Sequence, residues 1–304
     1  MTPIDTTLHL LLLIALPPLL LGVINKTKAA FAGRNGPPLL QLYYDLVRLF
    51  QKGSVFSTTT TWVFRAGPVV GLATCLLAGM IMPFGNHAAP FAFSGDLVAF
   101  AYLLGLGRFF TVAAALDTGS SFEGMGGARE ATFSCLAEPA LFFGLLTLAR
   151  RTASLSLSTM LGATMPGAWA STGASMILVA VSLFIVLLAE SSRIPFDDPN
   201  THLELTMVHE VMVLDHSGPA LGMILYSAAA KLMLLGAIVT RIALPFETGS
   251  SWTDWVVFVF GLFVLAILIG VVESVMARLR LIHVPRLLVG ACLLSAFGVV
   301  LLVR

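Results

Sequence analysis

Three ionisable side chains of this sequence lie near the middle of long apolar runs. Arg108, Glu138 and Lys231 each stand within about three residues of the centre of such a run. At about 1.5 Å of rise per residue, helical runs would place all three within roughly 4 Å of one depth. Charged groups in a bilayer interior are costly and are expected to face protein or water rather than lipid. The sequence therefore predicts a shared polar layer inside a membrane.

Proton transfer is the chemistry that this layer favours. A carboxyl and an amine in one dry layer, such as Glu138 and Lys231, can exchange a proton near neutral pH. Pro139 follows Glu138 and lacks the N–H that would bond the carbonyl of Cys135, so water finds an acceptor beside the carboxyl. The alternative is a buried ion pair that only fixes the packing of the helices.

Further acidic side chains lead from this layer toward one side of the chain. Glu123, Glu130 and Glu138 are spaced by seven and eight residues, so one continuous helix would stack them on one face. Residues 190–215 add carboxylates against a single arginine, which makes this stretch either a proton-feeding loop or a solvated acidic surface. The predicted proton pathway comprises Arg108, Asp117, Glu130, Glu138, Glu190, Asp197, Asp198, Glu204, Glu210 and Lys231.

A metal or redox centre within this chain is not expected. His202, His209 and His216 recur every seven residues, which on a helix separates neighbours by about 10 Å. That is too far for one ion with bonds of about 2.0 to 2.1 Å, so contact with a partner or proton handling is preferred. The three cysteines form no C-x-x-C pair, and no glycine-rich phosphate loop is present. Catalytic, cofactor-binding and metal-binding residues are therefore predicted to belong to other chains.

Membrane helices are the elements that must position these residues. The chain has 304 residues, of which 58% are hydrophobic and 11% charged, and a mean hydropathy of +0.95, whereas soluble domains carry about 25% charged residues. A hydrocarbon core of about 30 Å requires about 20 apolar residues per helix. Runs of that size cover residues 7–25, 62–83, 95–116, 131–149, 172–190, 219–242, 254–273 and 285–303. We expect an all-α integral membrane protein with about eight transmembrane helices in a single membrane domain over residues 1–304.

The basic residues predict the orientation of these helices. Eleven Lys and Arg flank the loops after the first, third, fifth and seventh runs, against four on the other side. The cytoplasmic side normally holds the excess, so both termini are predicted outside. Residues 1–7 carry no Lys or Arg, which favours a first transmembrane span over a cleavable signal peptide.

One further helix is expected at the membrane surface. The segment 36–52 begins with prolines that suit a first helical turn. Its apolar stripe contains Leu39, Tyr43, Leu46, Val47 and Phe50, and its polar face contains Gln41, Asp45, Arg48 and Lys52. An amphipathic helix of this kind lies along the interface, either on the membrane surface or against a docked subunit.

The loop sequences resemble a known family. The motifs are Gly33 to Gln41, Leu116 to Phe122 with Gly127 to Ala131 and Glu138-Pro139, Arg193 to Asp197, and Glu273-Ser274-x-x-Ala277-Arg278-Leu279-Arg280. Together they resemble the membrane anchor subunit shared by respiratory complex I and the energy-converting group 4 NiFe-hydrogenases. The chain is more similar to the formate hydrogenlyase and hydrogenase-4 type than to the quinone-reducing complex I subunit. After Asp198 it departs from both patterns.

The resemblance implies a non-catalytic subunit of an oxidoreductase complex in the bacterial cytoplasmic (inner) membrane. It would anchor a cytoplasmic redox arm and couple electron transfer to translocation of H⁺ or Na⁺. Glu138 and Glu190 match carboxylates of the family's proton channel. The residues expected at the partner interface are Arg34, Arg129, Arg193, His202, His209, Arg278 and Arg280.

The partners implied by the resemblance are the hydrogenase large and small subunits, an Fe-S subunit and antiporter-like membrane subunits, in addition to the lipid bilayer; nucleic acid is not expected. The NiFe centre and Fe-S clusters would lie in those partners. Three other functions stay open on the sequence: a quinone-site subunit of a complex I-like oxidoreductase, a stand-alone secondary transporter, and a purely structural anchor. Secondary transporters often show internal repeats, and this sequence shows no clear one.

Overall fold

The computed structural model describes residues 2–162, 165–197 and 207–303. Within these residues the fold is all-helical, and eight helices are long and apolar enough to cross a membrane. They are α1 (Pro3–Phe31), α3 (Trp62–Ile81), α4 (Asp96–Asp117), α5 (Ser121–Thr152), α7 (Met165–Glu190), α8 (Gly218–Ala243), α9 (Ser251–Val275) and α10 (Val284–Val303). The predicted fold class and the eight spans are confirmed.

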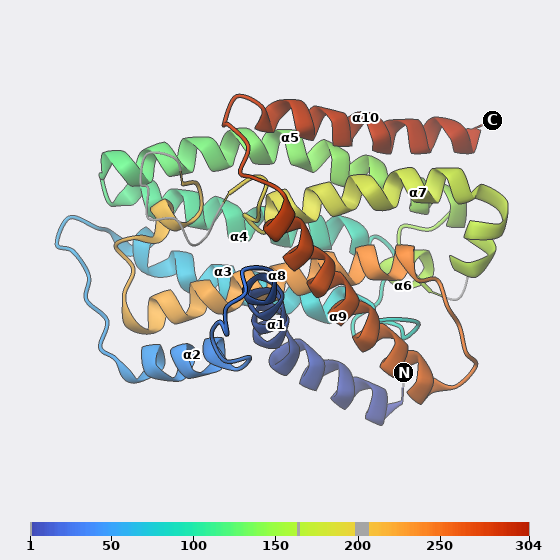
Figure 1. Cartoon of the computed structure of the whole chain (residues 1–304), viewed down its shortest axis with the longest axis horizontal. Helices are drawn as coiled ribbons and strands as arrows, with labels where there is room; N and C mark the ends of the chain where they lie inside the picture. The colour runs from blue at the N-terminus through green and yellow to red at the C-terminus, as the bar shows by residue number, and fades with distance from the viewer. Residues whose placement is uncertain (1, 163–164, 198–206, 304) are drawn as a thin grey trace.

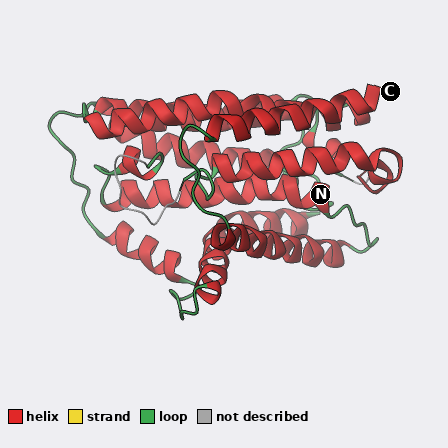
Figure 2. Cartoon of the chain, turned by 45° about the horizontal axis from the view of Figure 1, so that its top comes forward, coloured by secondary structure: helices red, strands yellow, loops and turns green. Residues whose placement is uncertain are grey.

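The long helices pack side by side, and most connecting loops gather at two ends (Figure 1 and Figure 2). α10 lies along α5 and α7, α3 lies between α4 and α8, and α1 and α9 cross the bundle obliquely. We call the end where α1 begins the terminal face; it also carries residues 82–95 and 244–250. The other side, toward which α1 and α9 run and which carries residues 32–61 and 276–283, is called the loop face.

Small residues and hydroxyls hold the helices close together. A Cβ atom built on Gly79 would lie 2.4 Å from the side chain of Leu13. α1 and α3 therefore approach closely here only because Gly79 has no side chain. Between α5, α7 and α10, the buried hydroxyl of Ser295 donates to the carbonyl of Ala140 at 2.9 Å and lies 2.5 Å from the Ser182 hydroxyl. Such interhelical hydrogen bonds replace water in a lipid environment.

A double proline inside α1 is compensated by a tyrosine of α8. Pro17 and Pro18 lack the N–H groups that would bond the carbonyls of Leu13 and Ile14. The hydroxyl of Tyr226 lies 3.0 Å from each of these two carbonyl oxygens. The freed acceptors of α1 therefore tie this helix to α8, as transmembrane helices with prolines require.

The predicted surface helix is α2 (Gln41–Gln51). It begins after Pro37 and Pro38, so the expectation that these prolines form its first turn is wrong. Leu46 is buried, and the hydroxyl of Tyr43 donates to the carbonyl of Ala15 in α1. Leu39, Val47 and Phe50 stay exposed, which divides the predicted apolar stripe between the protein and its surroundings.

Residues 191–197 and 207–217 form a largely buried connection between α7 and α8. They include the short 3-10 helix η1 (Glu210–Val213), and a further short helix, α6 (Leu157–Met160), precedes α7. His209 precedes η1 and His216 follows it, so these two histidines do not share the helix face expected from their spacing. Non-helical backbone inside a membrane protein is tolerated where protein or a cavity surrounds it. This segment reaches the middle of the bundle, where it meets the predicted polar layer.

Candidate functional site

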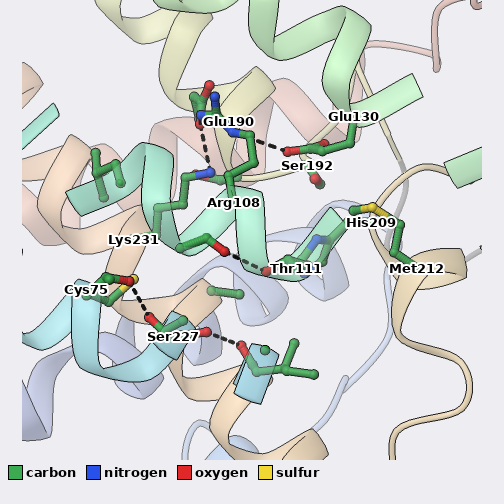
Figure 3. A pocket seen from close by; sticks show the side chains of 18 of the residues that line it. Cys75, Arg108, Thr111, Glu130, Glu190, Ser192, His209, Met212, Ser227 and Lys231 are labelled. Carbon is green, nitrogen blue, oxygen red and sulfur yellow. Dashed lines mark hydrogen bonds and ion pairs between the residues drawn. The ribbon is translucent and has the colours of Figure 1, made fainter. Parts of the chain in front are cut away.

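Arg108 is the centre of a buried ion cluster that joins three helices. Its guanidinium, on α4, pairs with Glu138 of α5 through Nη1 and with Glu190 at the end of α7 through Nη2. Its Nε lies 3.7 Å from Oε1 of Glu130, which stands eight residues before Glu138 on α5 (Figure 3). A planar guanidinium presents several donors in a fixed fork, which suits it to hold several carboxylates at once.

Lys231 of α8 joins the same cluster through Glu190. Its Nζ lies 2.7 Å from Oε2 of Glu190, the oxygen that also receives Arg108. The Glu190 side chain is only 5% exposed, whereas that of Glu138 is 46% exposed. The predicted polar layer therefore exists, but its pairing differs from the expected one: Lys231 neutralises Glu190, and Arg108 stands between Glu190 and Glu138.

The charges of this cluster do not balance, and one added proton would balance them. With every group ionised, Glu130, Glu138 and Glu190 carry three negative charges against two positive charges on Arg108 and Lys231. In surroundings of low polarity an excess charge is costly, and a carboxyl that takes up a proton removes it. Proton uptake at a carboxylate of the cluster is thus the chemistry that its composition favours.

A cavity of about 80 Å³ lies beside the cluster. Arg108, Glu130, Glu190 and Lys231 line it together with polar groups of the neighbouring helices (Figure 3). A cavity needs about 10 to 15 Å³ of space for each water molecule that it holds, so this one has room for several. Its further polar lining residues are Thr74, Cys75, Thr111, Ser191, Ser192, His209 and Ser227. Water in this space would connect the charged groups by short hydrogen bonds.

A second cavity of about 20 Å³ lies between α5, the end of α7 and the connection that follows α7. Glu130, Glu190 and Ser192 line both cavities, and Asp197 lines the second one. Asp197 is 2% exposed, and its carboxylate receives Nη2 of Arg278 at 2.8 Å. Polar groups thus continue from the middle of the bundle to the surface loop that holds Arg278.

His209 lines this site. Asp197 Oδ2 accepts the backbone N–H of Val208 at 2.9 Å and that of His209 at 3.3 Å, which fixes the position of the imidazole beside the cavity. Burial lowers the pKa of His209 below its ordinary value, although the nearby carboxylate of Glu130 acts in the opposite direction. His209 was predicted at a partner interface; in the structure it is half-buried and lines the cavity, because the connection between α7 and α8 folds inward.

Arg193 is likewise turned into the protein. Its Nη1 lies 3.3 Å from Oε1 of Glu273 in α9, and Oε2 of Glu273 lies 2.8 Å from Nζ of Lys28 in α1. The side chain of Glu273 is fully buried and that of Arg193 is 11% exposed. Arg193, which was predicted at a partner interface, instead joins α1, α9 and the α7 to α8 connection within this chain.

The remaining predicted residues lie in different places. Asp117 accepts hydrogen bonds from Thr61 N–H at 2.7 Å and Phe64 N–H at 3.2 Å, so it caps α3 and does not reach the cluster. Arg129 donates to the carbonyl of Met207 at 2.9 Å. Arg34 and Arg280 are exposed at the loop face, and Glu210 begins η1. Asp198, His202 and Glu204 lie outside the described residues.

The predicted continuous helix around Glu123 is confirmed, since α5 is unbroken over Ser121–Thr152. Glu123 is 1% exposed and its Oε1 accepts the N–H of Asp215 at 3.2 Å. Sequence reasoning missed the ion-pair role of Glu273 and the cavity-lining serines, Ser191 and Ser192. The charge in the last turns of an otherwise apolar run is the signal by which Glu273 could be found; the serines carry no comparable signal. Among the described residues, no group of three His, Cys, Asp or Glu side chains is placed to hold a metal ion.

Comparisons with known proteins agree on one family. A family model described as NADH dehydrogenase matches residues 5–304. The chain is 31% identical over 280 residues to hydrogenase-4 component C of Escherichia coli (strain K12), covering 90% of this chain and 87% of that protein. It is 30% identical over 284 residues to formate hydrogenlyase subunit 4 of the same organism, covering 91% of each.

The fold is also shared with a solved respiratory complex. A chain of the membrane-bound sulfane sulfur reductase, an archaeal respiratory membrane complex, superimposes with a TM-score of 0.84. The superposition covers 98% of each chain at 19% sequence identity. At this identity the likeness establishes the arrangement of the helices, and the cluster around Arg108 has to be interpreted from its own geometry.

Proposed function

Because this chain belongs to the NADH dehydrogenase family, we propose that it couples electron transfer in a hydrogenase-type respiratory complex to proton translocation. It is a multi-pass membrane protein related to hydrogenase-4 component C and formate hydrogenlyase subunit 4. The observation that carries this proposal is the buried cluster in which Arg108 and Lys231 share Glu190 beside a cavity. Three carboxylates against two cations can bind and release one proton without breaking the bundle.

The chain would act without a redox centre of its own. The NiFe centre and Fe-S clusters are assigned to partner subunits docked at the loop face, whose exposed residues include Arg34 and Arg280. The excess of Lys and Arg on this face supports the proposal that it is the cytoplasmic side of an inner membrane, with both termini outside. Large and small hydrogenase subunits and an Fe-S subunit are the proposed partners there.

Electrostatics would link the docked redox module to the cluster. At an effective dielectric constant of about 20, two unit charges about 4 Å apart interact by about 4 kcal/mol. Arg278 at the loop face holds Asp197, and Asp197 holds the backbone of His209 beside the cavity. A change of charge or shape at the docking loop would therefore alter the environment of Glu130 and Glu190 and shift their proton affinity.

Glu138 would relay the charge state of the cluster to a neighbouring membrane subunit. Its side chain is 46% exposed at the level of Arg108, where bare lipid would be a costly neighbour for a carboxylate. An antiporter-like subunit with polar groups at this depth would cover it. Protonation of Glu138 would weaken its pairing with Arg108 and leave the guanidinium to Glu190 and Glu130.

The test is Glu190→Gln in the whole complex, reconstituted in vesicles and driven with methyl viologen as electron carrier. Protons moved per electron pair are followed with a pH-sensitive dye. We expect the ratio to fall at least tenfold, because the amide cannot be ionised between two cations. Glu247→Gln, an exposed acid at the terminal face, is the matched control and keeps the ratio. An unchanged ratio in Glu190→Gln refutes the proposal.

A further inference from the structure

A second group of titratable side chains lies between the central cavity and the terminal face. It consists of His9 and Asp5 of α1 and His87 in the loop after α3. None of these residues belongs to the cluster around Arg108. The imidazole of His9 is fully buried inside a membrane-spanning helix, where an ionisable group is by default a candidate for function.

The surroundings of His9 leave one of its ring nitrogens available. Nε2 lies 2.9 Å from the carbonyl oxygen of Gly79 in α3, and the ring stacks on Phe84 with centroids 4.0 Å apart. Nδ1 is shielded from solvent and has no hydrogen-bond partner among the described residues. The bond from Nε2 to Gly79 and the stacking on Phe84 would be enough for a histidine that only joined two helices. Nδ1 takes part in neither contact, so a proton can bind there.

The spacing of these residues continues the line of polar groups that ends at the central cavity. Cys75 of α3 lines that cavity together with Lys231 (Figure 3). Gly79, which contacts His9, lies four residues further along α3, or about 6 Å toward the terminal face. Asp5 lies four residues before His9, again about 6 Å, on the same face of α1.

Asp5 and His87 complete the line at the terminal face. His87 Nδ1 lies 3.9 Å from Asp5 Oδ1, and the imidazole stacks on Trp255 of α9 at 4.1 Å. Asp5 also accepts the Ser251 hydroxyl at 3.1 Å and the Trp255 indole N–H at 3.3 Å. Burial lowers the pKa of His87, whereas the carboxylate of Asp5, a backbone hydrogen bond with Ser251 and the carboxylate of Asp254 act to raise it. Both side chains keep 11 to 14% exposure, so they are in reach of water.

We propose that His9, Asp5 and His87 form a proton release route from the central cavity to the terminal face. The inference rests on the proposed function, since it supplies the exit for a proton taken up at the cluster. His9 accepts one proton at Nδ1 and becomes imidazolium; the proton then passes to the His87 and Asp5 pair and to water. Each residue returns to its initial state, and no electron is transferred.

The experiment uses the whole complex in vesicles with methyl viologen as electron carrier. In His9→Gln the amide N–H still reaches the Gly79 carbonyl but cannot carry a proton onward. We expect protons moved per electron pair to fall at least fivefold in His9→Gln and at least threefold in His87→Gln. His283→Gln, an exposed histidine at the loop face, is the matched control. A merely structural His9 predicts an unchanged ratio in His9→Gln, and that result overturns the inference.

Glu190→Gln measured beside these variants separates the two proposals. If Glu190→Gln loses translocation and His9→Gln keeps it, the release route is wrong and the coupling role stands. If both keep it, both proposals fail. Should His9→Gln not assemble, infrared difference spectra of the unsubstituted complex with isotope-labelled histidine decide the matter. A histidine band that changes protonation during turnover and is lost in His87→Gln supports the route, and its absence refutes it.

Discussion

Lys231 and Glu190 form an ion pair of 2.7 Å between the middle of α8 and the last residue of α7. The pair places the end of α7 level with the middle of the bundle, so the buried connection that follows α7 begins beside the charged cluster. Arg108 shares the same carboxylate oxygen. The residue that ends one helix thereby fixes the relative positions of α4, α7 and α8.

Glu138→Gln is expected to lower protons moved per electron pair at least tenfold in the reconstituted complex. The glutamine keeps the size of the side chain and can still accept a bond from Arg108, but it cannot accept a proton at that oxygen. The measurement is dye quenching in vesicles, normalised to viologen turnover. Glu247→Gln serves as the control, and equal ratios in the two variants would count against Glu138 as a relay.

Arg108→Gln is expected to destabilise the chain by about 3 kcal/mol, because removal of one partner from a buried ion pair leaves uncompensated charge. Glu190 keeps Lys231, whereas Glu138 and Glu130 lose their cation. Thermal unfolding in detergent measures the loss. A double variant, Arg108→Gln with Glu138→Gln, should recover part of it, since both partners of one pair are then neutral; strict additivity would contradict the pairing.

Tyr226→Phe should lower the free energy of unfolding by about 1 kcal/mol, the usual net value of one hydrogen bond. The substitution removes the hydroxyl that bonds the carbonyls of Leu13 and Ile14, which the two prolines of α1 leave without backbone donors. Tyr102→Phe is the matched control, since Tyr102 is 75% exposed. Equal midpoints of thermal unfolding in both variants would show that the double proline needs no such partner.

Acid should destabilise the chain through His216, which lies before α8 and is 6% exposed. Burial lowers its pKa from 6.5 to about 4, and its ring stacks on Phe64 at 3.9 Å. The unfolded chain therefore binds a proton first: stability is full above pH 6.5 and falls as the pH drops from 6.5 toward 4. The total loss is about 3 kcal/mol at 1.36 kcal/mol per pKa unit.

His216→Phe keeps the stacking and removes the titration, so its thermal midpoint should fall less between pH 7.5 and pH 5 than that of the unsubstituted chain. His283→Phe, at an exposed position, should retain the original pH dependence. The reverse order of the two variants would mean that another group governs the acid response.

Arg278→Gln should lower stability by about 1 to 2 kcal/mol, because the buried carboxylate of Asp197 loses a charged donor. Arg280→Gln two residues away is exposed and should stay within about 0.5 kcal/mol of the unsubstituted chain. Thermal unfolding of the two variants in detergent makes the comparison. Equal losses would show that Asp197 does not depend on this pair.

The number and positions of the membrane helices were predictable because the cues are local. An apolar run of about 20 residues must become a helix in lipid, where every backbone N–H and C=O needs a partner within its own segment. The depth of Arg108, Glu138 and Lys231 follows from the same counting. α5 begins ten residues before its predicted apolar run. α7 begins seven residues before its predicted start, Thr172, and its backbone is kinked at Thr172.

Only the tertiary structure decided which charge meets which. Whether Lys231 faces Glu138 or Glu190 depends on the rotation of each helix about its axis and on the offset between helices, which residues distant in sequence determine together. The same holds for His209 and Arg193, which were expected at a partner surface and point inward because the connection after α7 folds back into the bundle. The composition requires that each buried charged group has a partner, whereas the packing of the helices decides which partner it has.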